Sequence, residues 1–345
     1  MAFRVGVVGV GPVGDRILRV LKERSFPVEG HPVVMATRER TEMLAGEEVL
    51  VREVAPELFD GLDVAFFAGR EGAKGAGVQW GEVATEAGAW VIDNGSDFRL
   101  EPGYPLIVPE VNMEAAVGES RHICSPNCST IQMVVAVAPL HRAAGIRRIV
   151  VSTYQSVSGW GQAAMEQFEQ QVQQYAAGEP VQFDPDIFSK PIVFDCLPHI
   201  DRFLESGYTK EEMKMVHETR KVMAEPDLPI TATTARVPVL IGHAESINLE
   251  LQRPLGREQA LEILRDPTQS PGVTVIDDPQ NLQYPSQADC LEDQHRDAVL
   301  VGRVREDPTV EHGLNLWCVS DNLRKGAATN TVQIAEGLIE RGLLA

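Results

Sequence analysis

Short apolar runs alternate with amphipathic stretches along the first third of the chain. Runs typical of buried strands cover residues 3–8, 32–36, 64–67 and 90–92. Between the first two runs, residues 12–24 place Ile17, Leu18, Val20 and Leu21 at helical spacing. Strands that alternate with helices predict an α/β fold with a parallel, doubly wound sheet, which binds ligands at the carboxyl ends of its strands.

The pattern continues in the second part with less regular spacing. We expect helices over residues 129–141 and 161–176, strands over 148–152 and 230–236, and irregular structure over 184–198. Thr209 and Glu212 have the spacing of a capping box that starts another helix, and the residues from Ser246 alternate like a half-buried strand. An apolar-striped helix over 322–341 is expected to pack back on the first sheet. The domain boundary is therefore expected near Asn127, with the last helix returning to the first domain.

Composition and charge narrow the classes of function. The 345 residues are 43% hydrophobic and 23% charged, and the net charge of −19 comes without a basic stripe, which argues against a nucleic-acid partner. No apolar run has the length of a membrane span. The first ten residues have the pattern of a strand, not of a signal peptide, and the five cysteines are scattered. We therefore expect free thiols and a cytoplasmic protein without membrane partners.

A glycine-rich turn follows the first predicted strand. Gly9, Gly11 and Gly14, with Pro12 and Val13 between them, form a GxGxxG pattern that opens the first helix. In this context the pattern predicts a dinucleotide site, because glycines let a pyrophosphate approach the backbone at a helix N-terminus. The alternative is a tight turn without a ligand.

The end of the second predicted strand bears on the choice of cofactor. NAD-binding sites usually carry an acidic residue there, whereas this chain has Thr37 and Arg38. An arginine at that place pairs with a 2′-phosphate and favours NADP. Glu39 and Glu42 lie close enough to weaken this preference, and a solvated run of charges is the alternative.

Cys128 follows Pro126-Asn127 and directly precedes a predicted helix. The N–H groups and partial positive charge of a helix N-terminus stabilise a thiolate, and also an oxyanion formed when that thiolate attacks a carbonyl. The alternative is a buried structural cysteine. Cys124 and Cys128 resemble half of a metal site, but no Cys/His pair at zinc spacing completes it, so we expect no metal.

Other polar residues are ambiguous when each is taken alone. Arg99 lies beyond an Asn-Gly turn and is either a surface charge or an anion ligand. Glu211 and Lys214 share a helix face, as surface ion pairs commonly do. His243 stands at a strand entrance, where a histidine is usually structural.

Six segments together resemble the aspartate-β-semialdehyde dehydrogenase family. The segment Ser125-Pro126-Asn127-Cys128-Ser129-Thr130-Ile131-Gln132 looks like the nucleophile motif of that family. The others occur in the family's order over nearly the whole chain: residues 92–99 (IDNGSDFR), 153–159 (TYQSVSG), 207–215 (GYTKEEMKM), 236–239 (RVPV) with His243, and 320–328 (SDNLRKGAA).

This resemblance implies a fold and a reaction. The fold would be a Rossmann-type dinucleotide-binding domain, residues 1–127 with 322–345, and an α+β catalytic and dimerisation domain, residues 128–321. The reaction would be NADPH-dependent reductive dephosphorylation of L-aspartyl 4-phosphate to L-aspartate 4-semialdehyde and phosphate. That step belongs to the biosynthesis of lysine, methionine, threonine, isoleucine and diaminopimelate. A homodimer or homotetramer is implied.

The resemblance also assigns roles to residues. Cys128 would be the nucleophile that forms an acyl-thioester, His243 the acid/base, and Gln155 a contact to the bound substrate. The substrate α-carboxylate would be held by Arg236 and its amino group by Glu211, with Asn127 beside the nucleophile. Phosphate would be bound by Arg99 and Lys214. Cofactor contacts would come from the following residues: Gly9, Gly11, Pro12, Val13, Gly14, Thr37, Arg38, Ser158, Gly159 and Asn322.

The chain departs from the family pattern in two places. Its glycine turn is one residue shorter than the usual Gly-Ala-Thr-Gly-x-Val-Gly, and Arg38-Glu39 replaces Arg-Ser. Because Glu39 would repel a 2′-phosphate, use of NAD stays open beside NADP. Two other functions also stay open: a sister acyl-phosphate reductase such as N-acetyl-glutamyl-phosphate reductase, and a non-catalytic paralogue. Glu211 paired with Arg236 favours a free amino acid over an acylated one.

Overall fold

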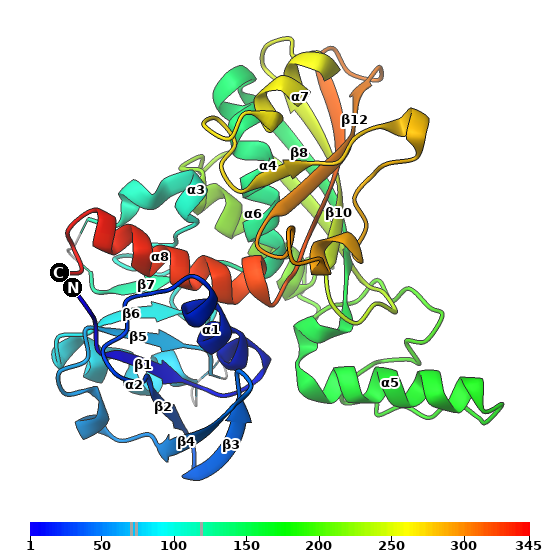
Figure 1. Cartoon of the computed structure of the whole chain (residues 1–345). Helices are drawn as coiled ribbons and strands as arrows, with labels where there is room; N and C mark the ends of the chain where they lie inside the picture. Colours follow the sequence, from blue (N-terminus) through cyan, green and yellow to red (C-terminus); the bar gives the residue numbers. More distant parts are fainter. Residues whose placement is uncertain (70–71, 73–74, 118–119) are drawn as a thin grey trace. The chain divides into compact units, whose positions relative to one another are not determined.

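A computed structural model describes residues 1–69, 72, 75–117 and 120–345. The chain forms two compact units, residues 1–127 with 327–345 and residues 128–326 (Figure 1). The crossings between the units thus fall at Asn127 and at Ala327, whereas the expected return to the first domain is at Asn322. Each unit is built on one β-sheet.

The first unit has the predicted doubly wound α/β architecture. Its seven strands lie in the order β3-β4-β2-β1-β5-β6-β7. The pairing is parallel except between β3 and β4, which form an antiparallel hairpin at one edge that the apolar pattern did not predict. The elements are β1 (Val5–Val8), α1 (Pro12–Glu23), β2 (Val33–Ala36), β3 (Arg40–Leu44), β4 (Glu47–Glu53), β5 (Val64–Phe67), α2 (Ala76–Glu86), β6 (Trp90–Asp93), α3 (Pro109–Asn112) and β7 (His122–Cys124), with 3₁₀ turns at Pro56–Phe59 and Met113–Ala115.

The last helix completes the core of this unit. The predicted helix over 322–341 is wrong at its start, because residues Arg324–Ala328 form a π-helical turn and α8 spans Thr329–Glu340. Val332, Ile334 and Leu338 of α8 pack into one buried cluster with the predicted apolar side of α1 and with β1. The expectation that the C-terminal helix packs back on the first domain is confirmed.

The second unit is built on a six-stranded mixed sheet, in the order β11-β12-β13-β10-β8-β9. Helices α4, α6 and α7 contact its strands, and α5 leads into an irregular segment over residues 178–208. The elements are α4 (Cys128–Ala144), β8 (Ile146–Gln155), α5 (Gln162–Ala176), α6 (Lys210–Val222), β9 (Ile230–Arg236), β10 (His243–Leu251), α7 (Arg257–Arg265), β11 (Val273–Val275), β12 (Val299–Asp307) and β13 (Gly313–Ser320), with 3₁₀ turns at Val157–Trp160, Pro279–Asn281 and Asp289–Leu291.

Helix α4 is buried more completely than its apolar spacing suggested. Residues 129–140 are all buried, including positions outside the predicted apolar face such as Met133, Ala136 and Val137. A helix that is apolar around most of its circumference is typically a central helix. Its first residue is Cys128 itself, one position earlier than predicted, so the thiol belongs to the first turn.

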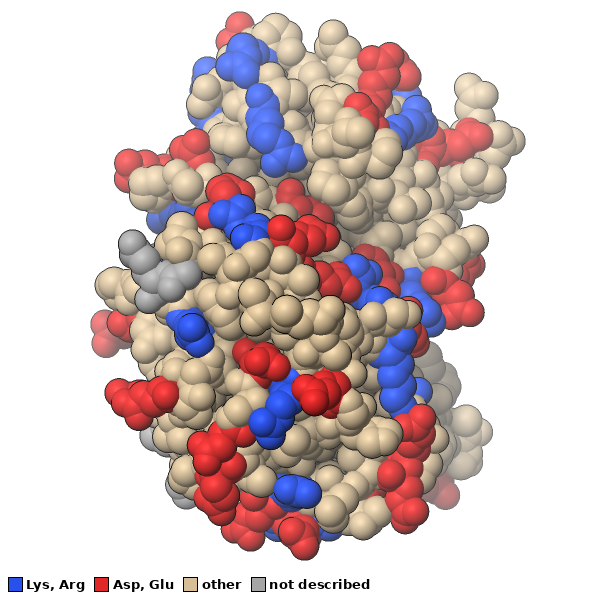
Figure 2. Space-filling model, turned by 60° about the vertical axis from the view of Figure 1, so that its left-hand side comes forward, with Lys and Arg blue, Asp and Glu red and all other residues tan. Residues whose placement is uncertain are grey.

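Charged side chains are mixed over the surface. On the face shown in Figure 2, lysines and arginines stand among aspartates and glutamates. Ion pairs of the described part of the chain include Arg24 with Glu336 (2.6 Å) and Arg40 with Glu42 (2.8 Å). No helix in the described part of the chain is long and apolar enough to cross a membrane.

Candidate active site

The glycine turn of the first unit has the form that a dinucleotide phosphate requires. Gly9 has φ +103°, and a Cβ there would collide with the backbone of residues 68–69. A Cβ on Gly14 would collide with the Gly9 carbonyl, whereas one on Gly11 would meet nothing within 4 Å. Gly11 precedes α1, and no side chain caps the helix at this end, so its first N–H groups receive no side-chain hydrogen bond from the N-cap residue. The turn therefore has room for a pyrophosphate, and the cofactor contact of these residues stays a prediction.

Thr37 and Arg38 follow β2 and are exposed. Arg40, two residues further, pairs with Glu42, and its guanidinium also donates to the Arg38 carbonyl. In the described part of the chain Arg38 itself has no ion pair. Its guanidinium is therefore available to an anion at the carboxyl end of β2.

Arg99 and Asn127 also belong to the first unit. Arg99 is 5% exposed, and its Nη2 donates to the carbonyl of Asn94, in the turn after β6 (2.7 Å). Asn127 is 8% exposed and immediately precedes α4. The segment before it is fixed from within the same unit, where Asn330 Nδ2 donates to Ser125 Oγ (3.0 Å). The Arg99 side chain is thus a buried cation, which rules out the alternative of a surface charge.

Cys128 is half-buried at the start of α4. A Cβ on Gly326 would lie 2.9 Å from the Cys128 Cβ, so only glycine lets this turn approach Cys128 so closely. The sequence supplied Gly326 as part of a motif and gave it no role. The helix N-terminus stabilises negative charge on the Cys128 sulfur.

Three of the predicted polar side chains end neighbouring strands at one edge of the second sheet. Gln155 of β8 pairs in register with Arg236 of β9. His243 begins β10 and lies one residue beyond the Ala244–Tyr154 pair, which places it next to Gln155. All three are at most 5% exposed. Strand register therefore brings together residues that are separated by up to 88 positions in sequence.

Glu211, in the first turn of α6, and Lys214, three residues further, join this group. Gln155 Nε2 donates to Glu211 Oε1 (3.2 Å) and to Ser129 Oγ (2.8 Å), which connects α6, β8 and α4. Lys214 Nζ pairs with Glu211 (3.3 Å) and Asp201 (3.4 Å). The Glu211 side chain is 7% exposed, so the predicted alternative of a solvent-facing ion pair is wrong.

The predicted capping box sets the position of α6. Thr209 Oγ1 accepts from the Glu212 N–H (3.3 Å), and Glu212 Oε2 accepts from the Thr209 N–H (2.7 Å). The second oxygen of Glu212 accepts from the Thr234 N–H of β9 (3.0 Å). The cap thus ties the first turn of α6, which carries Glu211, to the strand that carries Arg236.

The predicted cofactor contacts Ser158, Gly159 and Asn322 also lie beside His243. Asn322 Oδ1 accepts from Ser156 Oγ, from Ser158 Oγ (both 3.1 Å) and from the Gly242 N–H (2.9 Å). A Cβ on Gly159 would lie 3.0 Å from Arg236 Nη1 and 3.3 Å from His243 Nε2. Ser156 was not predicted, although it lies inside a predicted motif.

Burial and neighbouring charges perturb this group strongly. Burial lowers the pKa of Arg236, while the negative charges of Glu211 and Cys128 oppose that shift. Burial and the positive charge of Arg236 lower the pKa of His243 to about 3, against the opposing effect of Glu211. His243 is therefore neutral at physiological pH, and Arg236 remains the cation of the site.

A second row of polar residues lies one step further along the same strands and was not predicted. Thr234, Thr153, Glu245 and Cys318 are paired across β9, β8, β10 and β13, and all are at most 1% exposed. Cys318 Sγ donates to Glu245 Oε2 (3.4 Å), and burial raises the pKa of Glu245 to about 8. Among the described residues, Glu245 Oε1 has no hydrogen-bond partner. The sequence feature that could have indicated this row is Glu245, a carboxyl group within a mostly apolar segment.

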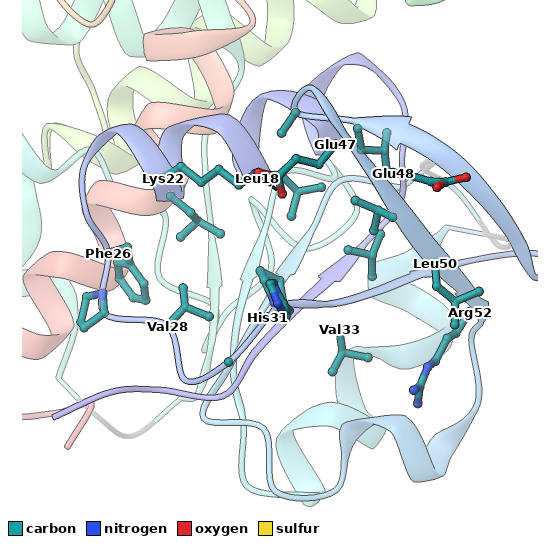
Figure 3. A pocket seen from close by; sticks show the side chains of 18 of the residues that line it. Leu18, Lys22, Phe26, Val28, His31, Val33, Glu47, Glu48, Leu50 and Arg52 are labelled. Atoms are coloured by element: carbon teal, nitrogen blue, oxygen red, sulfur yellow. Dashed lines mark ion pairs between the residues drawn. The ribbon is translucent and has the colours of Figure 1, made fainter.

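A cavity of about 740 Å³ opens elsewhere in the first unit. It lies between the second half of α1, the start of β2 and the β3–β4 hairpin, with Leu18, Phe26, Val33 and Leu50 among its lining residues (Figure 3). Lys22 and Glu47 pair across it (2.6 Å). It contains none of the predicted site residues, because it faces the amino end of β2. Among the described residues, no group of three or more His, Cys, Asp or Glu is placed to hold a metal ion.

Comparisons with known proteins place the chain among relatives of one family. Residues 4–118 match the family model "Semialdehyde dehydrogenase, NAD binding domain", and residues 137–325 match "Semialdehyde dehydrogenase, dimerisation domain". The chain is 45% identical to an aspartate-semialdehyde dehydrogenase of Aquifex aeolicus over the full length of both.

Solved structures give the same result. A crystal structure of aspartate semialdehyde dehydrogenase II from Vibrio cholerae superposes with a TM-score of 0.89 at 43% identity, covering 99% of each chain. The same enzyme complexed with ASA gives the same TM-score at 42% identity, over 99% of each chain. An aspartate semialdehyde dehydrogenase with NADP from Candida albicans gives 0.76 at 25% identity, covering 99% of this chain and 100% of that one.

Proposed function

The chain belongs to the aspartate-semialdehyde dehydrogenase family, and on this premise we propose how its residues reduce L-aspartyl 4-phosphate to L-aspartate 4-semialdehyde with release of phosphate. The observation that carries the proposal is the meeting, within one compact unit, of a thiol at a helix N-terminus with a buried imidazole and a buried guanidinium–carboxylate pair. These groups match the needs of acyl transfer through a covalent intermediate.

Cys128 is the nucleophile of this reaction. Its sulfur stands in the first turn of α4, close enough to Arg236 for their charges to interact. A thiolate in such a place attacks the acyl phosphate, forms a thioester and expels phosphate. Asn127 precedes it and Gln155 lies across the site, where its amide reaches both Ser129 and Glu211 and contacts the bound substrate.

The two ends of an amino acid match two opposite charges in the site. The Arg236 guanidinium suits the α-carboxylate, because its planar donors fit both oxygens. Glu211 suits the α-ammonium, which an N-acylated substrate lacks. This pair therefore supports a free amino acid as the substrate class over the substrate of a sister reductase.

Two cations serve the phosphate group. Lys214 is held between Glu211 and Asp201, and a phosphate dianion would replace part of those contacts. Arg99, in the other unit, is a second buried cation. We assign both to phosphate binding.

NADP is the proposed cofactor, with NAD as an accepted second one. Gly9, Gly11 and Gly14, with Pro12 and Val13, would hold the pyrophosphate, and Ser158, Gly159 and Asn322 would contact the cofactor from the second unit. Thr37 and Arg38 would bind the 2′-phosphate, for which Arg38 has no competing ion pair among the described residues. Glu39, next to it, explains why the preference is expected to be partial. When bound, the nicotinamide supplies the hydride that reduces the thioester.

We further propose a cytoplasmic homodimer, or a tetramer built from such dimers. No disulfide joins the five cysteines, which suits a reducing compartment. Within the matched dimerisation domain, Tyr175 of α5 (58% exposed) and Phe194 of the following irregular segment (70%) make an edge-to-face contact with ring centroids 4.5 Å apart. Exposed aromatic pairs of this kind are typical of interfaces. Light scattering of the wild type and of Phe194→Ser tests the pairing.

A steady-state assay tests the function directly. Purified protein is supplied with aspartate semialdehyde, phosphate, and NADP or NAD in parallel, and NADPH or NADH formation is followed. Turnover is expected with both cofactors and faster with NADP, and Cys128→Ala is expected to abolish it. A folded Cys128→Ala variant that still turns over would overturn the mechanism. Absence of turnover with either cofactor would favour a non-catalytic paralogue.

A further inference from the structure

A carboxylate–imidazole pair lies in the core of the first unit, beside the turn that leads to Arg99. Asp93 ends β6 and His122 begins β7, and both are at most 5% exposed. His122 pairs in register with Val91, which places its side chain on the same face of the sheet as that of Asp93. Because a carboxylate oxygen accepts, His122 Nε2 donates to Asp93 Oδ2 (3.3 Å). Neither residue has a role in the reaction proposed above.

Asp93 holds the start of the turn with its other carboxylate oxygen. Asp93 Oδ1 accepts from the Gly95 N–H (2.7 Å), a contact that fixes the chain direction just after β6. The Asp93 carbonyl accepts from the Ser125 N–H (2.8 Å), in the segment that leads to Asn127. One residue therefore connects His122, the turn and the segment before α4.

Asn94 is a fixed support for the Arg99 side chain. Asn94 Nδ2 donates to the Phe67 carbonyl at the end of β5 (3.1 Å), and its Oδ1 accepts from Thr331 Oγ1 of α8 (2.9 Å). The Arg99 guanidinium reaches back and donates to the Asn94 carbonyl (2.7 Å). The position of this cation therefore depends on the conformation of residues 94–98.

His122 holds the end of the same turn. Phe98 immediately precedes Arg99, and its ring meets the His122 ring edge to face, with centroids 5.0 Å apart. Tyr104 contacts the His122 ring at 5.1 Å and stacks on Phe98 at 4.6 Å. Aromatic rings attract one another in these arrangements. The imidazole thus contacts Asp93 at one end of the turn and Phe98 at the other.

Helix α2 encloses the pair from another side. A Cβ on Gly77 would lie 2.2 Å from Asp93 Oδ2, and one on Gly81 would lie 2.7 Å from His122 Cε1. Gly77 and Gly81 are four residues apart and therefore share a face of the helix. The backbone of α2 lies against both side chains and leaves neither of them room to move toward the helix.

We infer that Asp93 and His122 are positioning residues for phosphate binding, which hold the turn of residues 93–99 in the form that presents the Arg99 guanidinium. The inference rests on the proposed function, in which Arg99 binds phosphate, and extends it to two residues that act only through Arg99. A cation held in place before the anion arrives binds it without the cost of ordering a loop.

The reverse reaction separates this role from a general structural one. Oxidation of the semialdehyde leaves an acyl thioester on Cys128 and reduces NADP without phosphate. In the second half a phosphate oxygen bonds to the acyl carbon as the C–S bond breaks, sulfur keeps the electron pair, and the phosphate proton passes to water. Damage to the whole fold would slow both halves, whereas misplacement of Arg99 should slow only the second.

Steady-state and burst kinetics of two His122 variants test the inference. His122→Leu removes the donor to Asp93, and His122→Gln keeps an N–H. For His122→Leu we expect the KM for phosphate to rise at least about tenfold, equal to about 1.4 kcal/mol, with the NADPH burst and the KM for aspartate semialdehyde within about twofold of the wild type. His122→Gln should recover most of the loss. His312→Gln, in the connection between β12 and β13, is the matched control and should match the wild type.

A double-mutant cycle shows whether His122 acts through Arg99. Adding His122→Leu to Arg99→Ala should raise the KM for phosphate by less than about twofold, because the residue to be positioned is already absent. A full, independent effect on that background would overturn the inference. A KM for phosphate that is unchanged in His122→Leu, or a burst that falls in parallel with turnover, would also overturn it.

Asp93→Asn takes the place of His122→Leu if that variant does not fold. Asparagine keeps an oxygen for the Gly95 N–H and turns its NH₂ group toward His122, so the KM for phosphate should rise by a smaller factor. An unchanged KM in this variant would overturn the inference. A wild-type enzyme that forms no NADPH would instead show failure of the proposed function.

Discussion

At the residue scale, the site depends on two glycines, because a larger residue at either position would collide with neighbouring side chains. The φ of Gly159 is one that other residues can adopt. Glycine is needed there because a Cβ would lie 3.0 Å from the Arg236 guanidinium and 3.3 Å from the His243 ring. Glycine is needed at position 326 for the same reason, because a Cβ there would lie too close to the Cys128 Cβ. The function of both residues is to keep a space open.

Gly159→Ala should therefore damage catalysis more than folding. A methyl group would press on the Arg236 guanidinium and on the His243 ring, and small displacements of catalytic groups are costly. We expect kcat/KM to fall by at least about tenfold, with the free energy of unfolding changed by no more than about 1 kcal/mol. Gly256→Ala, at the start of α7, is the matched control and should keep full activity. A Gly159→Ala enzyme with wild-type kinetics would contradict this reading of the space.

The sequence was informative about which residues form the site and silent about their relations. Cys128, Gln155 and His243 were each predicted, and the structure places all three in one unit. The hydrogen bond to His243 Nδ1 was out of reach, because its donor is the backbone N–H of Ser156, which no side-chain pattern reports. Gly159 was predicted as a cofactor contact, and its closeness to Arg236 and His243 follows only from strand register.

At the element scale, the capping box of α6 links stability to substrate binding. Thr209→Ala removes the hydroxyl that accepts from the Glu212 N–H and should cost about 1 kcal/mol of unfolding free energy. Because Glu211 lies in the same turn, we expect KM for aspartate semialdehyde to rise with little change in kcat. Thr209→Ser should restore both quantities. Loss of stability with an unchanged KM would show that the cap does not position Glu211.

Helices and strands were predicted where the hydrophobic periodicity was strong. Elements that depend on a turn were missed. The β3–β4 hairpin turns at Ala45 and Gly46, which have φ of +50° and +80°, as expected for a two-residue hairpin turn. Gly46 lies between two segments in which apolar and polar residues alternate, which is the pattern of a hairpin. The charged residues nearby made that alternation hard to recognise. The π-helical turn at Arg324–Ala328 was missed because it encloses a fully buried Lys325, which apolar spacing cannot anticipate.

At the scale of the whole molecule, buried ionisable groups make stability depend on pH. Glu245 has its pKa raised from 4.5 to about 8, so between those values the folded chain holds a proton that the unfolded chain has lost. The free energy of unfolding should therefore fall as pH rises through this window, by at most about 1.4 kcal/mol per pH unit. Urea unfolding across pH measures it, and Glu245→Gln should remove this component. Parallel profiles for both proteins would contradict the assignment.

His243 has the opposite sign. Its pKa is lowered from 6.5 to about 3. In that pH range the histidine is protonated in the unfolded chain and neutral in the folded chain. Its contribution to stability is present above pH 6.5 and is lost as pH falls toward 3. The two effects oppose each other between pH 4.5 and pH 6.5, and Glu245→Gln should therefore expose the slope that His243 causes.

The fold class and the domain organisation of the whole molecule were predictable from the sequence. A doubly wound first sheet, a return of the last helix and a change of unit at Asn127 are all visible as local patterns or as a family motif. The second sheet is different, because β13 pairs with β10 across some 70 residues of sequence. Pairing at that distance is decided by tertiary packing, which local alternation does not encode.

The central claim is that Cys128 carries an aspartyl thioester, and an acyl-enzyme burst tests it most directly. The enzyme is mixed with aspartate semialdehyde and NADP without phosphate, and NADPH is followed at short times while peptides are analysed by mass spectrometry. We predict one NADPH per active site in a rapid phase, slow turnover afterwards, and an aspartyl adduct on the peptide that contains Cys128. Absence of the burst, or an adduct on any other residue, would contradict the account.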